Sequence, residues 1–465
     1  MRRDTGWGLR ARDARAGGRT GRRAGIAGAF AGRFSACGAP VAALAFLAQA
    51  LPAASVWQGP AGGDWFAEGN WSGGVPGDGG EAVIAGGASV LLTNLTAQLQ
   101  SLTVTGATLV MSNWQAKVRA AAVTVGAGGV ITLPGPFAAG AMSNRIHVVC
   151  GDLHVASGGA INADAKGYIA GPVTGGWGDG AGGGHGGIGG LSESGAAGGA
   201  VTDDPVYPVR PGGAGGSGRA APQDIGGAGG GAIRVEATGE IRIDGTVSAN
   251  GGNSGSSHPY TSGGGGAGGA ILLSAATFAG TGGVVRANGG DGGSFGATVL
   301  GGGGGGGRIS LLFNAGQQTS VPDIAVSARA GATPFPIQPW NFWKQADAGS
   351  IHAADLGKFF DLGAARIGGM AGYLRAPGTT QLAFDALNVA AGSCLGFDQD
   401  MRLEVTNGVT VPAGAALLAR GALTLVCGGS FTNAGIVQGS GGTNALAIGG
   451  DLVLTGSASE TRLKA

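Results

Sequence analysis

The sequence is poor in charge. Asp, Glu, Lys and Arg make up 12% of the 465 residues, against about 25% in an ordinary globular chain. Disordered chains are rich in charge and poor in β-branched residues, whereas Val, Ile and Thr recur throughout this one, so full disorder is excluded. Proline is also sparse, with 18 residues, and the glycines do not recur at every third position. A collagen triple helix is therefore excluded as well.

Cysteine is equally scarce. Of the four cysteines, Cys37 lies near the N-terminus, and Cys150, Cys394 and Cys427 are scattered without a CxxC spacing. A single intramolecular bridge among the last three would leave one thiol over. We interpret them as buried small hydrophobic residues, and we expect neither a metal site nor a cofactor.

The only long uncharged apolar run is close to the N-terminus. Nine arginines fall between Arg2 and Arg33, and "APVAALAFLAQALPAAS" follows. A basic region, an apolar stretch too short to span a membrane and small residues near position 54 are typical of a secretory signal. We assign residues 1–54 to this signal. Arg22-Arg23 leaves a twin-arginine signal open, and Cys37 a lipoprotein site.

Removal of this leader changes the charge. The remaining chain has 19 basic and 25 acidic residues, a formal net charge of −6. Nucleic-acid binding needs a basic surface, so nucleic acid is not an expected partner. The remaining chain has no apolar run long enough for a transmembrane span, and we expect an extracellular or cell-surface location.

What the chain has in abundance is glycine, with 104 residues, of which 51 lie between Gly171 and Gly307. Within this region a 38-residue repeat is visible. Ala232, Ala270 and Arg308 begin equivalent strand-like stretches at this spacing, and Asn250 and Asn288 follow the same interval. A unit of this kind cannot bury its apolar side alone, and stacking on its neighbours solves the problem, as in a solenoid.

Shorter repeats of about twenty residues flank this region. Leu102 and Val123 are 21 residues apart in matching segments, and Leu403 and Leu423 are 20 apart. Sharp turns with positive φ would use part of the glycine. The longer tracts, such as Gly301 to Gly307, are predicted to be loops that project from one side.

The stretch "VWQGPAGGDWFAEGNWSGGVPGDGGEAVI", residues 56–84, resembles the entry motif of bacterial secreted glycine-rich β-helix proteins, including autotransporter passengers. Trp57, Trp65, Asn70, Trp71, Pro76 and Ile84 occupy the motif positions. "QADAGSIHAADL", residues 345–356, resembles a strand that follows glycine repeats in the same proteins. The resemblance implies an all-β, right-handed parallel β-helix. No translocator barrel or sorting tail follows, so we expect either release or a fragment of a longer protein.

Candidate catalytic groups are scattered. Some β-helix proteins cleave acidic polysaccharides with carboxylates that share one position in successive turns. Asp152, Asp164, Asp244 and Asp291 do not share a phase in the repeat, and we interpret them as solvated turn residues. "ANGGDGG" leaves a single calcium ion open, although the nine-residue period of calcium-binding β-rolls is missing.

The histidines offer no metal-ligand spacing. His185 and His258 lie in glycine-rich loops without a nearby His or Cys, and His147 and His154 are expected on opposite faces of one strand. Neither a G-x-S-x-G elbow nor a phosphate-binding loop occurs. No catalytic residue is therefore assigned.

The segment "TPFPIQPWNFWK" concentrates aromatic side chains. Phe335, Trp340, Phe342 and Trp343 are predicted either to plug the end of the glycine-rich stack or to contact a glycan or a protein. They are the ligand-binding residues that the sequence offers.

These observations predict β-helix coils at residues 55–166, glycine-rich repeats at 167–335 and further coils at 336–465. The expected function is structural or adhesive, without catalysis, and the expected partners are extracellular glycans, surface proteins or copies of the chain itself. A carbohydrate-active enzyme, either a polysaccharide lyase or a glycoside hydrolase, and a glycan-binding module on the same scaffold are the alternatives.

Overall fold

The computed structural model describes residues 53–463 with gaps at 139–140, 170–179, 219–224, 255–261, 296–298, 335–344, 361–365, 368–370, 376–378, 390, 392–393 and 455–459. The chain divides into two units, residues 1–51 and 52–465. The predicted leader lies outside the described residues except for its last two positions, and the fold below is that of the second unit.

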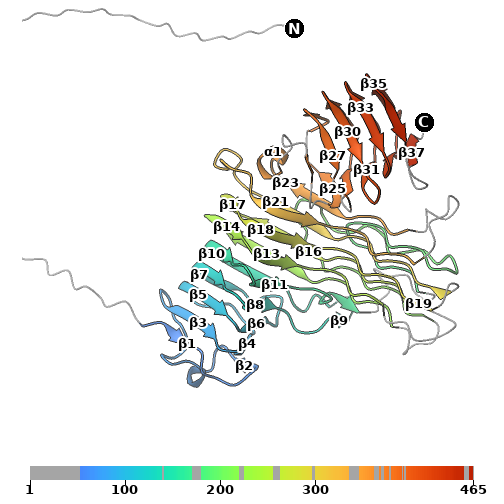
Figure 1. Ribbon diagram of the computed structural model, residues 1–465. Coiled ribbons are helices and arrows are strands. Elements are labelled where there is room, and N and C mark those ends of the chain that lie inside the picture. The colour runs from blue at the N-terminus through green and yellow to red at the C-terminus, as the bar shows by residue number, and fades with distance from the viewer. Residues whose placement is uncertain are drawn as a thin grey trace, which may run out of the picture. The chain divides into compact units, whose positions relative to one another are not determined.

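The second unit is built mainly from parallel β-strands, most of which pair with the strand one pass of the chain later (Figure 1). The longest column, here called column A, runs through the whole unit. Its members, in order of pairing, are β1 (Ser55–Val56), β3 (Glu81–Ala85), β5 (Leu99–Thr105), β7 (Val118–Val125), β10 (Ile146–Val155), β13 (Ala232–Ala237), β16 (Ala270–Ser274), β21 (Arg308–Leu312), β23 (Ser350–Ala353), β25 (Ala371–Arg375), β28 (Cys394–Phe397), β31 (Ala416–Ala419), β34 (Ile436–Gly439) and β37 (Glu460–Leu463).

Other columns supply the remaining sides of each pass. One joins β2 (Gly63–Asp64), β4 (Ser89–Leu92), β6 (Thr108–Met111), β8 (Val130–Thr132), β11 (Ala160–Asn162), β15 (Thr246–Ser248), β18 (Thr281–Arg286) and β22 (Asp323–Ser327). β14 (Glu240–Ile243) pairs with the second half of β10 and with β17 (Thr277–Ala279).

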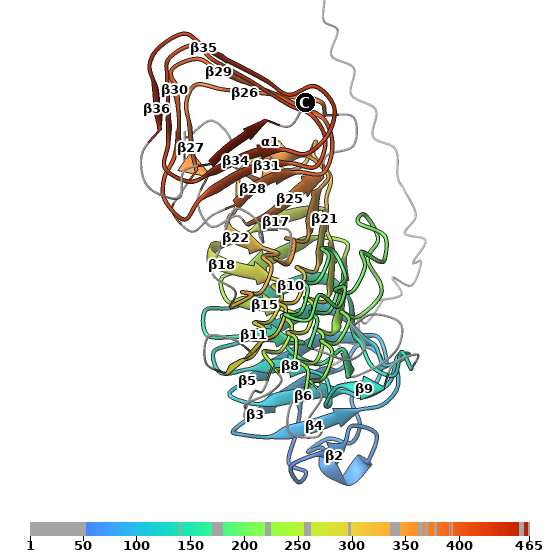
Figure 2. The same ribbon diagram turned by 90° about the vertical axis from the view of Figure 1, so that its right-hand side faces the viewer.

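In the C-terminal passes two further columns accompany column A, so that each pass has three sides (Figure 2). One contains β24 (Arg366–Ile367), β27 (Leu387–Val389), β30 (Gly408–Val411), β33 (Ser430–Asn433) and β36 (Leu452–Leu454). The other contains β26 (Gln381–Phe384), β29 (Met401–Val405), β32 (Leu423–Cys427) and β35 (Ala445–Ile448).

The remaining elements are short. β9 (Phe137–Ala138) pairs in parallel with β12 (Tyr168–Ile169), whereas β19 (Ser294–Phe295) and β20 (Val299–Leu300) are antiparallel. The described helices are a 3₁₀ turn, η1 (Glu68–Asn70), and α1 (Leu356–Phe359). The Asp355 carboxylate accepts the amides of the first turn of α1, which caps it. No helix in the described part of the chain has the length and apolar character needed to cross a bilayer.

The pairing register tests the predicted repeats. Ala232, Ala270 and Arg308 are direct partners in three successive strands, as the 38-residue spacing predicts, and Leu102 pairs with Val123. The predicted match of Leu403 with Leu423 is wrong. Leu403 pairs with Leu425 and Leu423 with Met401, because this pass of the chain, which includes β30 and β31, is two residues longer than the sequence similarity suggested.

The core is a set of aliphatic ladders enclosed by the columns. Each layer places one side chain directly above that of the previous layer, and burial of such apolar surface is the main stabilising term of the fold. A ladder with no exposed surface consists of Ile84, Val104, Val125, Val155 and Ile243. The outward positions between these residues are polar or partly exposed, which gives the period-2 pattern of the strands.

The tryptophans of the motif at residues 56–84 close the first layers. Trp57, Trp65 and Trp71 are buried and pack edge to face, with ring centroids 5.1 Å and 4.8 Å apart around Trp71. The Trp71 indole N–H donates to the Trp65 carbonyl at 2.7 Å. This cluster covers apolar side chains that would otherwise face water at the start of the stack.

Some glycines are required by their backbone conformation. Gly106, Gly128 and Gly158 have φ of 54°, 68° and 77° and sit in the turns of successive layers. They also stack, because the Gly128 amide donates to the Gly158 carbonyl at 2.8 Å. Positive φ at a repeated turn selects glycine, as the sequence predicts.

Most of the glycine in the middle region serves a different purpose. The tracts at 180–190, 212–216, 226–231, 249–252, 263–269, 287–293 and 301–307 do not project as separate loops but hydrogen-bond to one another, and we call this set the glycine bundle (Figure 1). In the tract 263–269, the backbone amides that donate to the same neighbouring tract are three residues apart. The donor–acceptor pairs are Gly264–Gly216 and Ala267–Gly213, Gly265–Gly302 and Gly268–Gly305, Gly266–Gly252 and Gly269–Ala249.

A three-residue period is that of the polyproline II helix, which has no internal hydrogen bonds. The carbonyls of the same tract accept from three further tracts, through the amides of Gly183, Gly227 and Gly290. Each such extended helix can therefore bond to six neighbours. A Cβ at Gly266 would lie closer than 3.0 Å to backbone carbonyls of Ala228 and Gly227. Glycine is needed here because the backbones touch.

Candidate functional site

The predicted aromatic ligand-binding residues fall in the gap at 335–344. Phe335, Trp340, Phe342 and Trp343 lie outside the described residues, so their role as a plug or as a contact stays a prediction.

The four aspartates considered as catalytic candidates serve a common structural purpose. Each accepts a hydrogen bond from a backbone amide of another pass, and so ties two layers together. The pairs are Asp152 with Glu240 (2.7 Å), Asp164 with Asn250 (2.6 Å), Asp244 with Thr281 (2.8 Å) and Asp291 with Ala332 (2.7 Å). They are therefore hydrogen-bonded rather than merely solvated, and Asp152 lies within β10 rather than in a turn.

The histidine pair of β10 differs from the sequence prediction. His147 and His154 both point outward, where His147 Nε2 is 2.7 Å from Glu236 and His154 Nε2 is 2.9 Å from Asp244. Seven residues in a regular strand would place them on opposite faces. The alternation of inward and outward side chains is interrupted at Gly151 and Asp152, two consecutive residues that are not buried. After this interruption His154 points outward, as His147 does.

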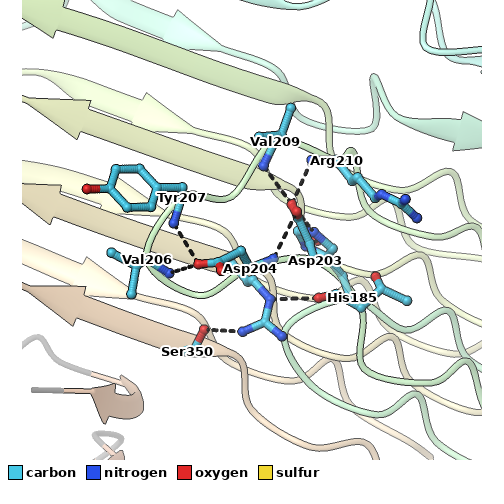
Figure 3. A network of polar contacts seen from close by, with 11 residues as sticks. His185, Asp203, Asp204, Val206, Tyr207, Val209, Arg210 and Ser350 are labelled. Carbon is cyan, nitrogen blue, oxygen red and sulfur yellow. Dashed lines mark hydrogen bonds and ion pairs between the residues drawn. The ribbon is translucent and has the colours of Figure 1, made fainter. Parts of the chain in front are cut away.

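A buried polar network surrounds His185 (Figure 3). His185 is fully buried; its Nδ1 is 3.0 Å from the Gly268 carbonyl in the glycine bundle and its Nε2 is 3.5 Å from Asp203. The Asp203 carboxylate also accepts the amides of Val209 and Arg210 at 2.7 Å and 2.6 Å. Although burial opposes it, the nearby His185 ring and the hydrogen bonds from these amides hold the pKa of Asp203 below its ordinary value.

This network holds the loop 202–210 against column A. Asp204 accepts the amides of Val206 and Tyr207. Arg308 of β21 donates to the Thr202 carbonyl and to Ser350 of β23 (Figure 3). The outer side of these strands is therefore covered. The loop presents Tyr207 to solvent with 60% of its surface exposed.

A second charged cluster lies on the outer side of β7, β10 and β13, and sequence reasoning missed it. Glu236 accepts two hydrogen bonds from Arg234, at 2.9 Å and 3.0 Å, and one from His147. The hydrogen bonds from Arg234, followed by that from His147, lower the pKa of Glu236 to about 2. Lys117, Arg119 and Arg145 lie around this group with no ion-pair partner among the residues that the structure describes.

Burial lowers the pKa of His147 to about 4, and the positive charges of Arg145 and Lys117 add to this effect, against the hydrogen bond to Glu236. The imidazole is therefore neutral at pH 7. Because the ionised Glu236 can only accept, His147 Nε2 carries the proton. His147 Nδ1 is then an acceptor, and it is buried without a partner in the described part of the chain.

A third cluster joins distant segments through Arg420. Its guanidinium donates to Asp347 at 2.6 Å and to Asp398 at 2.7 Å, and its carbon lies 4.1 Å from the centre of the Tyr373 ring. Although burial opposes it, the two carboxylates raise the pKa of Arg420. Burial followed by the Asp347 charge raises the pKa of Tyr373, so this phenol is not a base at neutral pH.

None of these clusters has the composition of a metal site, since no group of three or more His, Cys, Asp or Glu residues in the described ranges could hold a metal ion. The three described cysteines are free. Burial raises the pKa of Cys150 and of Cys394 to about 12, which keeps both thiols protonated and poor nucleophiles.

Comparisons with protein-family models, with curated proteins and with solved structures found no match to this chain.

Proposed function

We propose that this chain is an exported structural or adhesive scaffold, a right-handed parallel β-helix that acts at the cell surface or in the extracellular matrix without catalysis. The observation that supports it best is the parallel pairing of column A, which continues from β1 to β37. A stack of this kind gains stability from each nearest-neighbour layer, so it suits a protein whose task is to extend and to present surface.

The use made of polar side chains supports the same proposal. Asp244 and Arg420 bond to backbone or charged groups of other passes, as do the other candidate aspartates. Asp203 bonds to amides of its own loop. Their hydrogen-bonding capacity is spent within the fold. What remains for a partner is the outward surface of the layers and the loop that carries Tyr207.

Adhesion on such a scaffold would come from several weak contacts made together, which raises the overall affinity without any single strong site. Extracellular glycans, surface proteins and other copies of the chain are the partners we propose. The carbohydrate-active enzyme receives no comparable support, because each of the four candidate aspartates accepts a backbone amide of another pass.

The test has two parts. The full chain is expressed in a Gram-negative host, and cell fractions are probed for the position and the N-terminus of the product. The purified chain from Val56 onward is then applied to a glycan array, followed by product analysis of any glycan that binds. We expect export with removal of the leader, and binding without cleavage. Retention in the cytoplasm, or release of shortened glycan, would contradict the proposal.

A further inference from the structure

The charged cluster around Glu236 contains more cations than the fold uses. Val118 pairs with Val148 and His147 pairs with Arg234, so Lys117, His147 and Arg234 occupy the same register position in three successive layers of column A. Neighbouring strands are about 4.8 Å apart, so the side chains of adjacent layers stack directly. Val118, Val148 and Val235 are buried, which places this position on the outer side of the sheet.

The guanidinium of Arg145 is oriented by contacts with Trp114. Its Nε donates to the Trp114 carbonyl at 2.8 Å, and its guanidinium carbon lies 5.0 Å from the centre of the Trp114 ring. Stacking and this single hydrogen bond fix the plane of the guanidinium, while its Nη groups have no ion-pair partner in the described part of the chain. A fixed guanidinium with free N–H groups is the geometry that binds carboxylate or sulfate.

Internal neutralisation is incomplete. Glu236 is the carboxylate within the cluster, and it is already bonded to Arg234 and His147. Burial, and then the positive charge of Arg234, lower the pKa of Arg145, while Glu236 opposes this. Repulsion between these neighbouring positive charges is unfavourable. A bound anion would reduce this repulsion.

We propose that Lys117, Arg119, Arg145 and Arg234, here called the basic face, form a binding site for the carboxylate groups of an acidic polysaccharide. The inference rests on the proposed function, because an exported scaffold meets extracellular polysaccharides. It deepens that function by naming a ligand class. The cations follow the stack from one layer to the next, so they match a polymer with regularly spaced acid groups that lies along column A. The half-buried ring of Trp114 borders this path and offers an apolar edge to a sugar.

Titration calorimetry of the chain from Val56 onward tests the site. The probe is an oligogalacturonate, and a neutral cello-oligosaccharide of equal length is the comparison. We expect binding of the acidic oligomer alone, with an affinity that falls as salt is added. Lys117→Gln combined with Arg145→Gln should weaken binding by at least about tenfold, because two charge-assisted contacts are lost.

The matched control is Arg402→Gln. Arg402 on β29 bonds Glu404 through Nε at 2.8 Å, much as Arg234 bonds Glu236, but it lies outside the basic face. This variant should bind like the unsubstituted chain. Circular dichroism and the unfolding midpoint show whether each variant is folded. If the double variant is not folded, the single variant Arg119→Gln takes its place, because Arg119 is partly exposed. We expect a smaller but measurable loss of affinity for the acidic oligomer in this variant.

The proposal is overturned if the neutral oligomer binds as tightly, or if the basic-face variants bind the acidic oligomer unchanged. It is also overturned if duplex DNA or anionic lipid vesicles displace the oligogalacturonate at equal charge concentration, since the site would then prefer another class of partner. Absence of binding in a chain that is still exported would remove the site and leave the scaffold proposal standing.

Discussion

At the scale of single residues, glycine has two separate roles in this protein. In the turns it provides positive φ, as at Gly128. A residue with a Cβ at this position would have to adopt the left-handed backbone conformation, which is unfavourable for it. In the glycine bundle it allows backbones to touch, as at Gly266, whose neighbours are carbonyls of another tract. Hydrogen bonds and close packing stabilise the bundle, since its tracts have almost no side chains to bury.

The second role predicts a large effect of one methyl group. Gly266→Ala should lower the free energy of unfolding by about 2 kcal/mol, because the Cβ overlaps fixed backbone atoms of tract 226–231. Gly135→Ala is the control, since nothing lies within 4 Å of its added Cβ. Urea unfolding followed by circular dichroism compares them. Equal midpoints for the two variants would show that the bundle is not packed as described.

A second effect at this scale concerns His147, which is 4% exposed. Its pKa is about 4 in the folded protein and about 6.5 when unfolded, so the unfolded state binds a proton first as the pH falls. Stability should therefore decline between about pH 6.5 and pH 4, by on the order of 3 kcal/mol. The loss of stability that follows from the lowered pKa of Glu236 begins only near the acid end of this pH range.

His147→Gln removes this titration and keeps a donor for Glu236, so the variant should lose most of the decline between pH 6.5 and pH 4. His154→Gln is the matched control, because the His154 side chain is 41% exposed and also bonds a carboxylate. Urea midpoints measured across this pH range check both. A slope that is the same in all three proteins would refute the assignment of a buried neutral imidazole.

At the scale of elements, successive passes are tied by side chains as well as by strand pairing. Asp164 accepts the amide of Asn250, Asn250 accepts that of Asn288, and Asn288 accepts that of Arg329. The distances are 2.6 Å, 2.9 Å and 2.8 Å. This ladder of side-chain acceptors follows the ends of strands, where the regular pairing stops, and carries the register into the glycine bundle.

Breaking one step of the ladder should loosen the next layer. Asn288→Ala removes the acceptor for the Arg329 amide and for the Ser327 hydroxyl, and we expect a loss of about 1–2 kcal/mol. Hydrogen exchange of the Arg329 amide should accelerate. Asn113→Ala serves as control, since Asn113 accepts an amide two residues away in its own turn. An unchanged exchange rate at Arg329 would mean that the ladder does not hold the layers.

The sequence allows the register to be predicted where layers repeat. The 38-residue spacing of Ala232, Ala270 and Arg308 is correct because those units carry the same pattern of strands and turns. The step from β10 to β13, in which Ile146 pairs with Ile233, could not be read. The intervening chain enters the glycine bundle, where a uniform sequence gives no sign of which tract contacts which.

The same limit applies to the site. Lys117, His147 and Arg234 are distant in sequence and meet only through register steps of unequal length. The sequence signal was the alternation of cationic residues with buried valines in these strands. This alternation indicates that the cations point outward, but it does not show which cations of different strands lie side by side. Glu236 could not be matched to His147 for the same reason.

At the scale of the described unit, the strand columns and the glycine bundle form one hydrogen-bonded structure. Tracts leave column A, pack against each other and return, so that Gly269 and Gly307 lead directly into β16 and β21. A bundle that restrains the N-terminal ends of these strands supports the scaffold we propose. The loop with Tyr207 is attached to the bundle through His185 and to column A through Arg308.

Hydrogen–deuterium exchange of the glycine tracts tests the central claim most directly. The amides of Gly264 to Gly269 and of Gly301 to Gly307 should exchange about as slowly as those of Ile271 to Leu273 in β16, because most of them donate to carbonyls of neighbouring tracts. Exchange of the glycine amides at the rate of an unstructured peptide, while β16 stays protected, would contradict the account and return the glycine-rich region to a set of projecting loops.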